Sequence, residues 1–217
     1  MVTLSIDLFW SFRSPYSYLA TPRLCEMGRD YDLTINVRPV YPIAVRAGEF
    51  FSQVNPLWVG YLMRDTMRLA QMLELPYRWP RPDPVVVDIN TRAATPNQPY
   101  IHRLTRLGCA AAEIGRGLPF LKEISHTIWS GQFDNWHEGD HLAKAARRAG
   151  TDLPQLDEKI AADPDRYEAI IQENQKAHQA AGHWGVPTMA FEGEPFFGQD
   201  RLDVLLWRLK QKGLQAR

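Results

Sequence analysis

The stretch that most constrains the fold runs from Phe9 to Ala20, FWSFRSPYSYLA, because an apolar strand pattern ends there and a helix begins at one Ser-Pro step. Ser is a preferred N-cap residue and Pro a preferred first helical residue. Ser14 and Pro15 therefore predict a helix start that places the Ser14 hydroxyl beside backbone N–H groups without helical partners. Such a helix start favours negative charge, so it would stabilise a thiolate supplied from elsewhere.

The N-terminal part of the chain predicts a β-α-β unit. Residues 2–9 are rich in strand formers, and the helix that starts at Ser14 is expected to run to about Gly28 with a kink at Pro22. Residues 33–40, LTINVRPV, form the second strand pattern. Two strands joined through a helix are expected to lie parallel.

The C-terminal part predicts a hairpin and a helix. Two short apolar runs, VPTMAFEG from Val186 and EPFFG from Glu194, indicate two antiparallel strands. A final helix is expected from Asp200 to about Lys210, with Asp200 as its N-cap. The Val186-Pro187 bond lies at the start of the first strand of this hairpin. A cis conformation there would turn the Val186 backbone toward a ligand, although few X-Pro bonds are cis.

Helical patterns fill the middle of the chain, over about 57–74, 100–114, 119–130, 141–149, a short segment after Leu153, and 164–181. Asp65 lies on the apolar stripe of the first of these helices, so it either pairs, for instance with Arg68, or lines a polar cavity. Residues 75–99 contain six prolines and predict a long ordered loop or lid. Asn90 and Arg92 are candidates for a functional role there, with a purely structural crossing as the equal alternative.

Composition excludes several classes of function. The chain has 217 residues with 25 basic and 25 acidic side chains, so no net charge attracts nucleic acid or an anionic membrane. It has no apolar run long enough to span a bilayer, and its first dozen residues lack the basic region of a secretion signal. Cys25 and Cys109 have no CxxC spacing and are expected to be buried free thiols. We therefore expect a soluble, cytoplasmic protein.

Two catalytic motifs can be set aside. His137 to His141, HEGDH, matches the HExxH zinc-hydrolase pattern, which requires both histidines on one continuous helix. Gly139 is a poor helix-interior residue and Asp140 a good N-cap, so the helix is expected to begin inside the motif. No G-x-S-x-G surrounds Ser14, which disfavours a serine hydrolase.

Three segments together resemble the 2-hydroxychromene-2-carboxylate isomerase and kappa-class glutathione transferase family. They are SPYSYL from Ser14, GVPT from Gly185, and FGQDR from Phe197. The resemblance implies an α/β fold in which residues 1–45 and 184–217 form a thioredoxin-like domain with a cis proline at Pro187. Residues 46–183 would form a DsbA-like helical insertion. It also implies bound glutathione, a small aromatic substrate and a homodimer.

The resemblance assigns individual roles to four residues and includes the cis proline, Pro187, among those that bind glutathione. Ser14 resembles the family's catalytic serine, whose hydroxyl binds the glutathione sulfur; related folds carry CxxC where this chain has Ser14-Pro15-Tyr16-Ser17. Val186, before Pro187, resembles the residue whose backbone pairs with the cysteinyl part of glutathione. Gln199 and Asp200 resemble the pair that holds its γ-glutamyl end.

One position departs from the family. Trp58 stands where members usually carry a lysine that faces an acidic group, so a cation must come from elsewhere; the candidates are Arg13, Arg46, Arg64 and Arg92. The leading hypothesis is a glutathione-dependent isomerase that acts on an aromatic-degradation intermediate. The alternatives are a kappa-like glutathione transferase or peroxidase and a glutathione-binding module without catalysis, for which the Trp58 departure is the best support.

Overall fold

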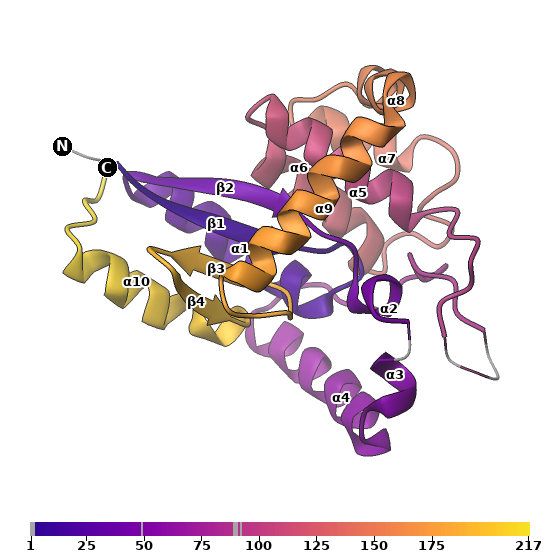
Figure 1. Ribbon diagram of the computed structural model, residues 1–217, viewed down its shortest axis with the longest axis horizontal. Coiled ribbons are helices and arrows are strands. Elements are labelled where there is room, and N and C mark those ends of the chain that lie inside the picture. The colour runs from indigo at the N-terminus through magenta and orange to yellow at the C-terminus, as the bar shows by residue number, and fades with distance from the viewer. Residues whose placement is uncertain (1–2, 49, 89–90, 92) are drawn as a thin grey trace.

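The computed structural model describes residues 3–48, 50–88, 91 and 93–217, and it contains a four-stranded sheet in the order β2-β1-β3-β4 (Figure 1). β1 (Leu4–Trp10) and β2 (Leu33–Pro39) are parallel over their full lengths, and α1 (Pro15–Asp30) connects them. β3 (Thr188–Phe191) runs antiparallel to β1 and pairs with the edge strand β4 (Glu194–Phe197). The predicted β-α-β and β-β elements are confirmed.

Successive side chains of β1 point to opposite faces of the sheet, and a helix covers each face. Trp10 points to α1, where its Nε1 donates hydrogen bonds to the Ser17 carbonyl and the Thr21 hydroxyl. Phe9 points the other way and stacks on His178 of α9 (Pro164–Ala180), with ring centroids 4.7 Å apart. Figure 1 shows α9 crossing one face of the sheet while α1 and α10 (Leu202–Gln211) lie on the other.

The helical part lies between β2 and β3 in the sequence. It comprises α2 (Ile43–Arg46), α3 (Phe50–Gln53), α4 (Pro56–Met72), α5 (Ile101–Glu113), α6 (Gly117–Trp129), α7 (His141–Arg148), α8 (Leu153–Ala162) and α9. The two short helices α2 and α3 were not predicted. In Figure 1, α5 to α8 form one group beyond the sheet, whereas α4 lies apart from them. Pro22 lies inside α1, and the helix ends at Asp30, two residues beyond the expected end at Gly28.

The core joins the sheet to the helical part through buried aromatic residues. Trp129, at the end of α6, donates a hydrogen bond from Nε1 to the Phe12 carbonyl at 2.9 Å. Its ring stacks on Tyr77, with centroids 5.9 Å apart, and Tyr77 belongs to the loop that follows α4. The segment between α4 and α5 holds no helix among its described residues, as predicted. Asn90 and Arg92 lie outside the described residues.

The apolar stripe predicted on α4 is largely not part of the core. The fully buried residues of this helix are Thr66 and Ala70, while Trp58, Tyr61 and Met72 are exposed. A helical period indicates which side chains share a face but not whether another element covers that face. Among the described residues, no helix is both long and apolar enough to cross a bilayer.

Candidate functional site

Ser14 joins the first helix to the loop before β3. It is the N-cap of α1, where its Oγ accepts a hydrogen bond from the Ser17 N–H at 3.1 Å, as predicted. The same hydroxyl donates to the Val186 carbonyl, also at 3.1 Å. Ser14 is 8% exposed, so this hydroxyl lies at the edge of solvent with both of its partners fixed by the backbone. The N-terminal end of α1 adds a positive potential at the same point.

The Val186-Pro187 peptide bond is cis, which confirms the predicted conformation. Val186 precedes β3 and lies outside the strand register, and no hydrogen bond from its N–H is found among the described residues. The Pro187 carbonyl accepts a hydrogen bond from the Gly198 N–H at 2.9 Å. Hydrogen bonds therefore link the cis-proline loop to α1, through Ser14, and to the start of the last helical segment, through Gly198.

Gln199 and Asp200 lie in a 3-10 turn, η1 (Gln199–Arg201), which packs against α1 and leads into α10. Gln199 is 5% exposed, and its side-chain amide makes no hydrogen bond among the described residues. The prediction that Asp200 caps the last helix is wrong. Because the turn begins one residue earlier, at Gln199, with Gly198 as its N-cap, Asp200 lies within it, and its exposed carboxylate instead faces the Arg201 guanidinium at 3.6 Å.

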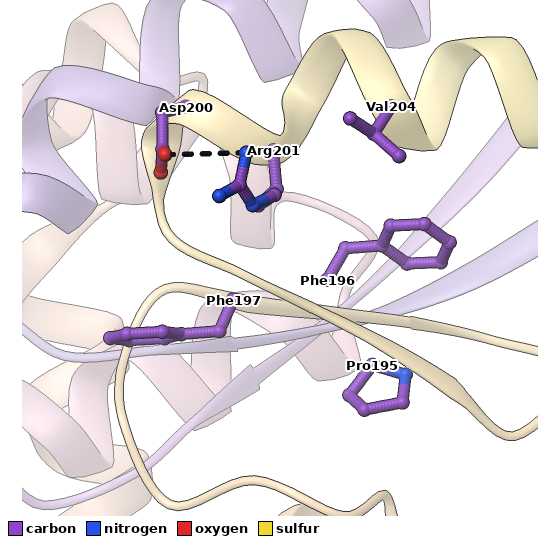
Figure 2. A pocket seen from close by; sticks show the side chains of 6 residues that line it. All are labelled: Pro195, Phe196, Phe197, Asp200, Arg201 and Val204. Atoms are coloured by element: carbon purple, nitrogen blue, oxygen red, sulfur yellow. Dashed lines mark ion pairs between the residues drawn. The ribbon is translucent and has the colours of Figure 1, made fainter.

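An open hollow of about 530 Å³ lies between β4 and the start of α10 (Figure 2). Its lining residues are Pro195, Phe196, Phe197, Asp200, Arg201 and Val204. Asp200 is the one predicted site residue among them. Figure 2 shows Asp200 and Arg201 at one end of this hollow and Phe196 and Pro195 along β4. The hollow adjoins the predicted γ-glutamyl position but does not include Ser14 or Val186.

Asp65 is bound by two tyrosines, not by Arg68. Its carboxylate accepts a hydrogen bond from the Tyr16 hydroxyl at 2.8 Å and one from the Tyr61 hydroxyl at 3.3 Å. Burial, followed by the Asp65 carboxylate, raises the pKa of Tyr16, so its phenol stays protonated and donates. Tyr16 comes two residues after Ser14, and sequence reasoning missed this link between α1 and α4. The available signal was the carboxylate of Asp65 on an apolar stripe, which requires hydrogen-bond donors, together with the tyrosines at positions 16 and 61.

The four candidate arginines differ in their partners. Arg13 pairs with Asp83 through two hydrogen bonds of 2.9 and 3.0 Å. Arg46 donates from Nε to the Tyr41 carbonyl and from Nη2 to the Trp184 carbonyl, and burial lowers its pKa to about 10. Arg64 is exposed on α4 and has no carboxylate partner in the described part of the chain. Arg92 lies outside the described residues.

Five rings form a partly exposed group that we call the aromatic cluster. Its members are Phe50, Trp58, His183, Trp184 and Phe197. The ring centroids of successive neighbours lie 4.0 to 5.9 Å apart. The cluster joins α3 and α4 to the residues just before the cis proline and to β4. Trp58 was singled out from the sequence, but its neighbours were not, because most of them (His183, Trp184 and Phe197) come from segments far away in the chain.

Neither cysteine is a candidate nucleophile. Both are free thiols, as predicted; Cys109 is also buried as predicted, whereas Cys25 is only partly buried. Burial raises the pKa of Cys25 to about 11 and that of Cys109 to about 12. His137 lies in a turn and α7 begins at His141, so the HExxH match does not lie on one helix, as predicted. Any thiolate at Ser14 must therefore come from a ligand.

The chain is similar to known proteins over nearly its whole length. The family model described as DSBA-like thioredoxin domain matches residues 5–210. A 2-hydroxychromene-2-carboxylate isomerase of Sphingobium xenophagum is 30% identical over 212 residues, covering 94% of this chain and 97% of the relative. Glutathione S-transferase kappa 1 of Rattus norvegicus is 22% identical, covering 95% and 91%. The solved structure of a 2-hydroxychromene-2-carboxylate isomerase aligns with a TM-score of 0.70 at 21% identity, covering 96% and 95%.

Proposed function

Because the chain belongs to the DsbA-like thioredoxin family that includes 2-hydroxychromene-2-carboxylate isomerases and a kappa-class glutathione transferase, we propose that it is a glutathione-dependent isomerase. Its substrate would be a small aromatic compound with a conjugated double bond, and the enzyme would act as a homodimer in the cytoplasm. The observation that carries the proposal is the Ser14 hydroxyl, held between the first turn of α1 and the Val186 carbonyl.

The loop before β3 has the groups needed to hold a peptide. Val186 has an N–H without a partner among the described residues and a carbonyl whose partner there is the Ser14 hydroxyl. An extended peptide binds such a segment through paired backbone hydrogen bonds, as an added strand does. The cysteinyl residue of glutathione fits this position because its sulfur would then face Ser14.

Ser14 is suited to hold a thiolate. Its Oγ lone pair already accepts the Ser17 N–H, so its own proton is the group left to donate. When a peptide N–H takes the Val186 carbonyl, the hydroxyl proton can turn from that carbonyl to the sulfur. The hydrogen bond and the N-terminal end of α1 both favour the charged form and lower the thiol pKa toward neutrality.

Gln199 and Asp200 supply complementary groups for the other end of the tripeptide. The amide of Gln199 has both donors and an acceptor and no side-chain partner among the described residues. The Asp200 carboxylate is exposed and can pair with the α-ammonium of a γ-glutamyl group. Both residues lie in the turn that packs against α1, so they lie on the same side of the sheet as the helix that Ser14 caps.

Bound glutathione would supply a thiolate that adds to a conjugated double bond, permits rotation about the resulting single bond, and leaves again. The chain would hold the sulfur through Ser14 and orient the tripeptide through Val186 and the η1 turn. Neither Cys25 nor Cys109 would compete as nucleophile, since burial raises both pKa values. The second candidate is a transferase that releases the conjugate, favoured by the similarity to the kappa-class relative.

Calorimetric titration with glutathione tests the proposal. We expect binding, and we expect γ-glutamyl-2-aminobutyryl-glycine, which lacks the sulfur, to bind about 10-fold more weakly because it cannot accept the Ser14 hydrogen bond. Product analysis should then show an isomerised substrate with the glutathione pool unchanged. Consumption of glutathione would indicate the transferase, binding without turnover would indicate a binding module, and no binding would refute the proposal.

A further inference from the structure

Arg46 carries a charge that no acidic group balances in the described part of the chain. It ends the short helix α2, and its guanidinium contacts the carbonyl of Trp184, two residues before Val186. Resting on the proposed function, we propose that Arg46 binds the glycyl carboxylate of glutathione. It would thereby set the direction in which the tripeptide lies on the cis-proline loop and would select thiols with a carboxylate at this end.

Two backbone carbonyls hold the Arg46 guanidinium and leave part of it free for a ligand. Nε donates to the Tyr41 carbonyl at 2.6 Å, and Nη2 donates to the Trp184 carbonyl at 2.9 Å. Nη1 has no hydrogen-bond partner among the described residues and does not belong to their buried unpaired atoms, so it reaches solvent. A guanidinium has five N–H donors in a planar fork that matches a carboxylate. The fork is therefore fixed in place before a ligand arrives.

The surroundings of Arg46 favour an anion. The side chain is half-buried, and burial lowers its pKa to about 10, so it is charged at pH 7 but has lost part of its hydration. No carboxylate of the described residues raises this pKa again. Burial also lowers the pKa values of His178 and His183 below 6.5, so both rings are mostly neutral at pH 7. A carboxylate would supply the missing partner charge.

The backbone at Val186 determines which part of the tripeptide reaches Arg46. In an antiparallel pair, two opposite residues exchange both of their N–H···O bonds. Val186 can pair in this way with the cysteinyl residue, because its N–H has no partner among the described residues and its carbonyl is bound there by the Ser14 hydroxyl. The next ligand residue, glycine, then lies opposite Gly185, and its carboxylate points toward Trp184. This is the residue whose carbonyl Arg46 binds.

The charges at the two ends of the loop fit this direction and not the reverse one. Antiparallel pairing directs the γ-glutamyl group toward Pro187, whose carbonyl accepts the Gly198 N–H at 2.9 Å. Asp200 follows in the η1 turn, where its carboxylate can pair with the α-ammonium group. The reverse direction would bring the glycyl carboxylate to Asp200 and the ammonium to Arg46. Like charges would then meet at both ends, which disfavours that arrangement.

Glutathione and its glycyl ethyl ester test the inference, because the ester lacks only the charge of the glycyl carboxylate. In calorimetry we expect the wild type to bind the ester about 10-fold more weakly, since a hydrogen bond between charged groups is lost. Arg46→Gln should weaken glutathione binding about 10-fold and change ester binding by less than about twofold. Arg46→Lys keeps the charge but not the planar fork, so the preference for glutathione should fall to about 3-fold.

The same change at Arg64 is the matched control. Arg64 is exposed on α4, where an ion pair contributes little, so Arg64→Gln should keep the wild-type ratio of the two affinities. Equal weakening of both ligands in Arg46→Gln would show that the guanidinium only supports the loop, and it would overturn the inference. Loss of the preference in Arg64→Gln would do the same. If Arg46→Gln does not fold, an Arg46→Lys ratio equal to that of the wild type would also overturn it.

The two ligands also separate this inference from the proposed function. Normal binding of glutathione by the wild type with equal affinity for the ester would refute the role of Arg46 and leave that of Ser14 intact. Binding of neither ligand would refute both. Ser14→Ala acts on the sulfur and not on the glycyl end, so it should weaken both ligands alike and keep their ratio at about 10.

Discussion

Replacement of Ser14 by alanine is expected to lower the glutathione-dependent turnover by about 100-fold, because loss of one donor to a developing or bound anion typically costs two to three orders of magnitude. The substitution removes the proton donor that now binds the Val186 carbonyl at 3.1 Å. It also removes the cap of α1, at a cost of about 1 kcal/mol in the free energy of unfolding. Initial rates at saturating glutathione and a urea titration measure the two effects separately.

Ser17→Ala is the matched control for this experiment. Ser17 lies on the same helix, three residues along, and its buried Oγ has no hydrogen-bond partner among the described residues. The change removes a hydroxyl of the same kind without touching the Ser14 side chain, so turnover should stay within about twofold and stability should not fall. Equal rates for Ser14→Ala and the wild type would refute the role of Ser14 as the hydrogen-bond donor to the thiolate. A second check is a pH titration of bound glutathione, followed by the ultraviolet absorbance of its thiolate. The midpoint of this titration should lie at higher pH in Ser14→Ala than in the wild type.

Lowering the pH from 7 to 5 is expected to destabilise the protein by about 2 kcal/mol through His178 alone, a 30-fold change in the unfolding equilibrium. His178 is fully buried, and neither ring nitrogen has a hydrogen-bond partner among the described residues. Burial, with a smaller effect of the nearby Arg46 charge, lowers its pKa from 6.5 to about 4. Between these two values the unfolded chain binds a proton that the native protein does not. Stability therefore falls as pH falls through this window, and the loss is complete near pH 4.

Urea midpoints at pH 7 and pH 5 measure this effect. His178→Leu removes the titrating ring at nearly constant volume, and it should reduce the pH dependence by about 2 kcal/mol. A His178→Leu protein that loses stability between pH 7 and pH 5 as steeply as the wild type would contradict the assignment.

The parts of the fold and site that the sequence predicted well are those set by neighbouring residues. The Ser14-Pro15 step determines the first helix start because the cap and the fixed proline φ act within a few residues. The parallel pairing of β1 and β2 follows from the single helix between them. The cis conformation at Pro187 was predicted from the resemblance of three short segments to a known family, and the structure confirms it.

The features that sequence reasoning missed depend on partners far away in the chain. Arg68 on the same helix was one partner considered for Asp65, but Tyr16 approaches it from a helix 49 residues earlier. Arg46 could not be ranked among the candidate cations because the Trp184 carbonyl that it binds is 138 residues away. Periodicity placed Trp58 on an apolar stripe, yet whether that stripe was covered depended on how α4 packs against the rest. Local patterns do not contain this information.

The raised pKa values of the two cysteines bear on the proposed use of a thiol that comes from a ligand. At pH 7 a thiol of pKa about 11 is ionised in about one molecule in ten thousand, and Cys109 less still. Thiol–disulfide exchange begins with attack by a protein thiolate on the oxidised tripeptide. Exchange of either cysteine with oxidised glutathione would therefore be slow, and oxidising conditions that deplete the proposed cofactor would leave both thiols free of mixed disulfide by this route.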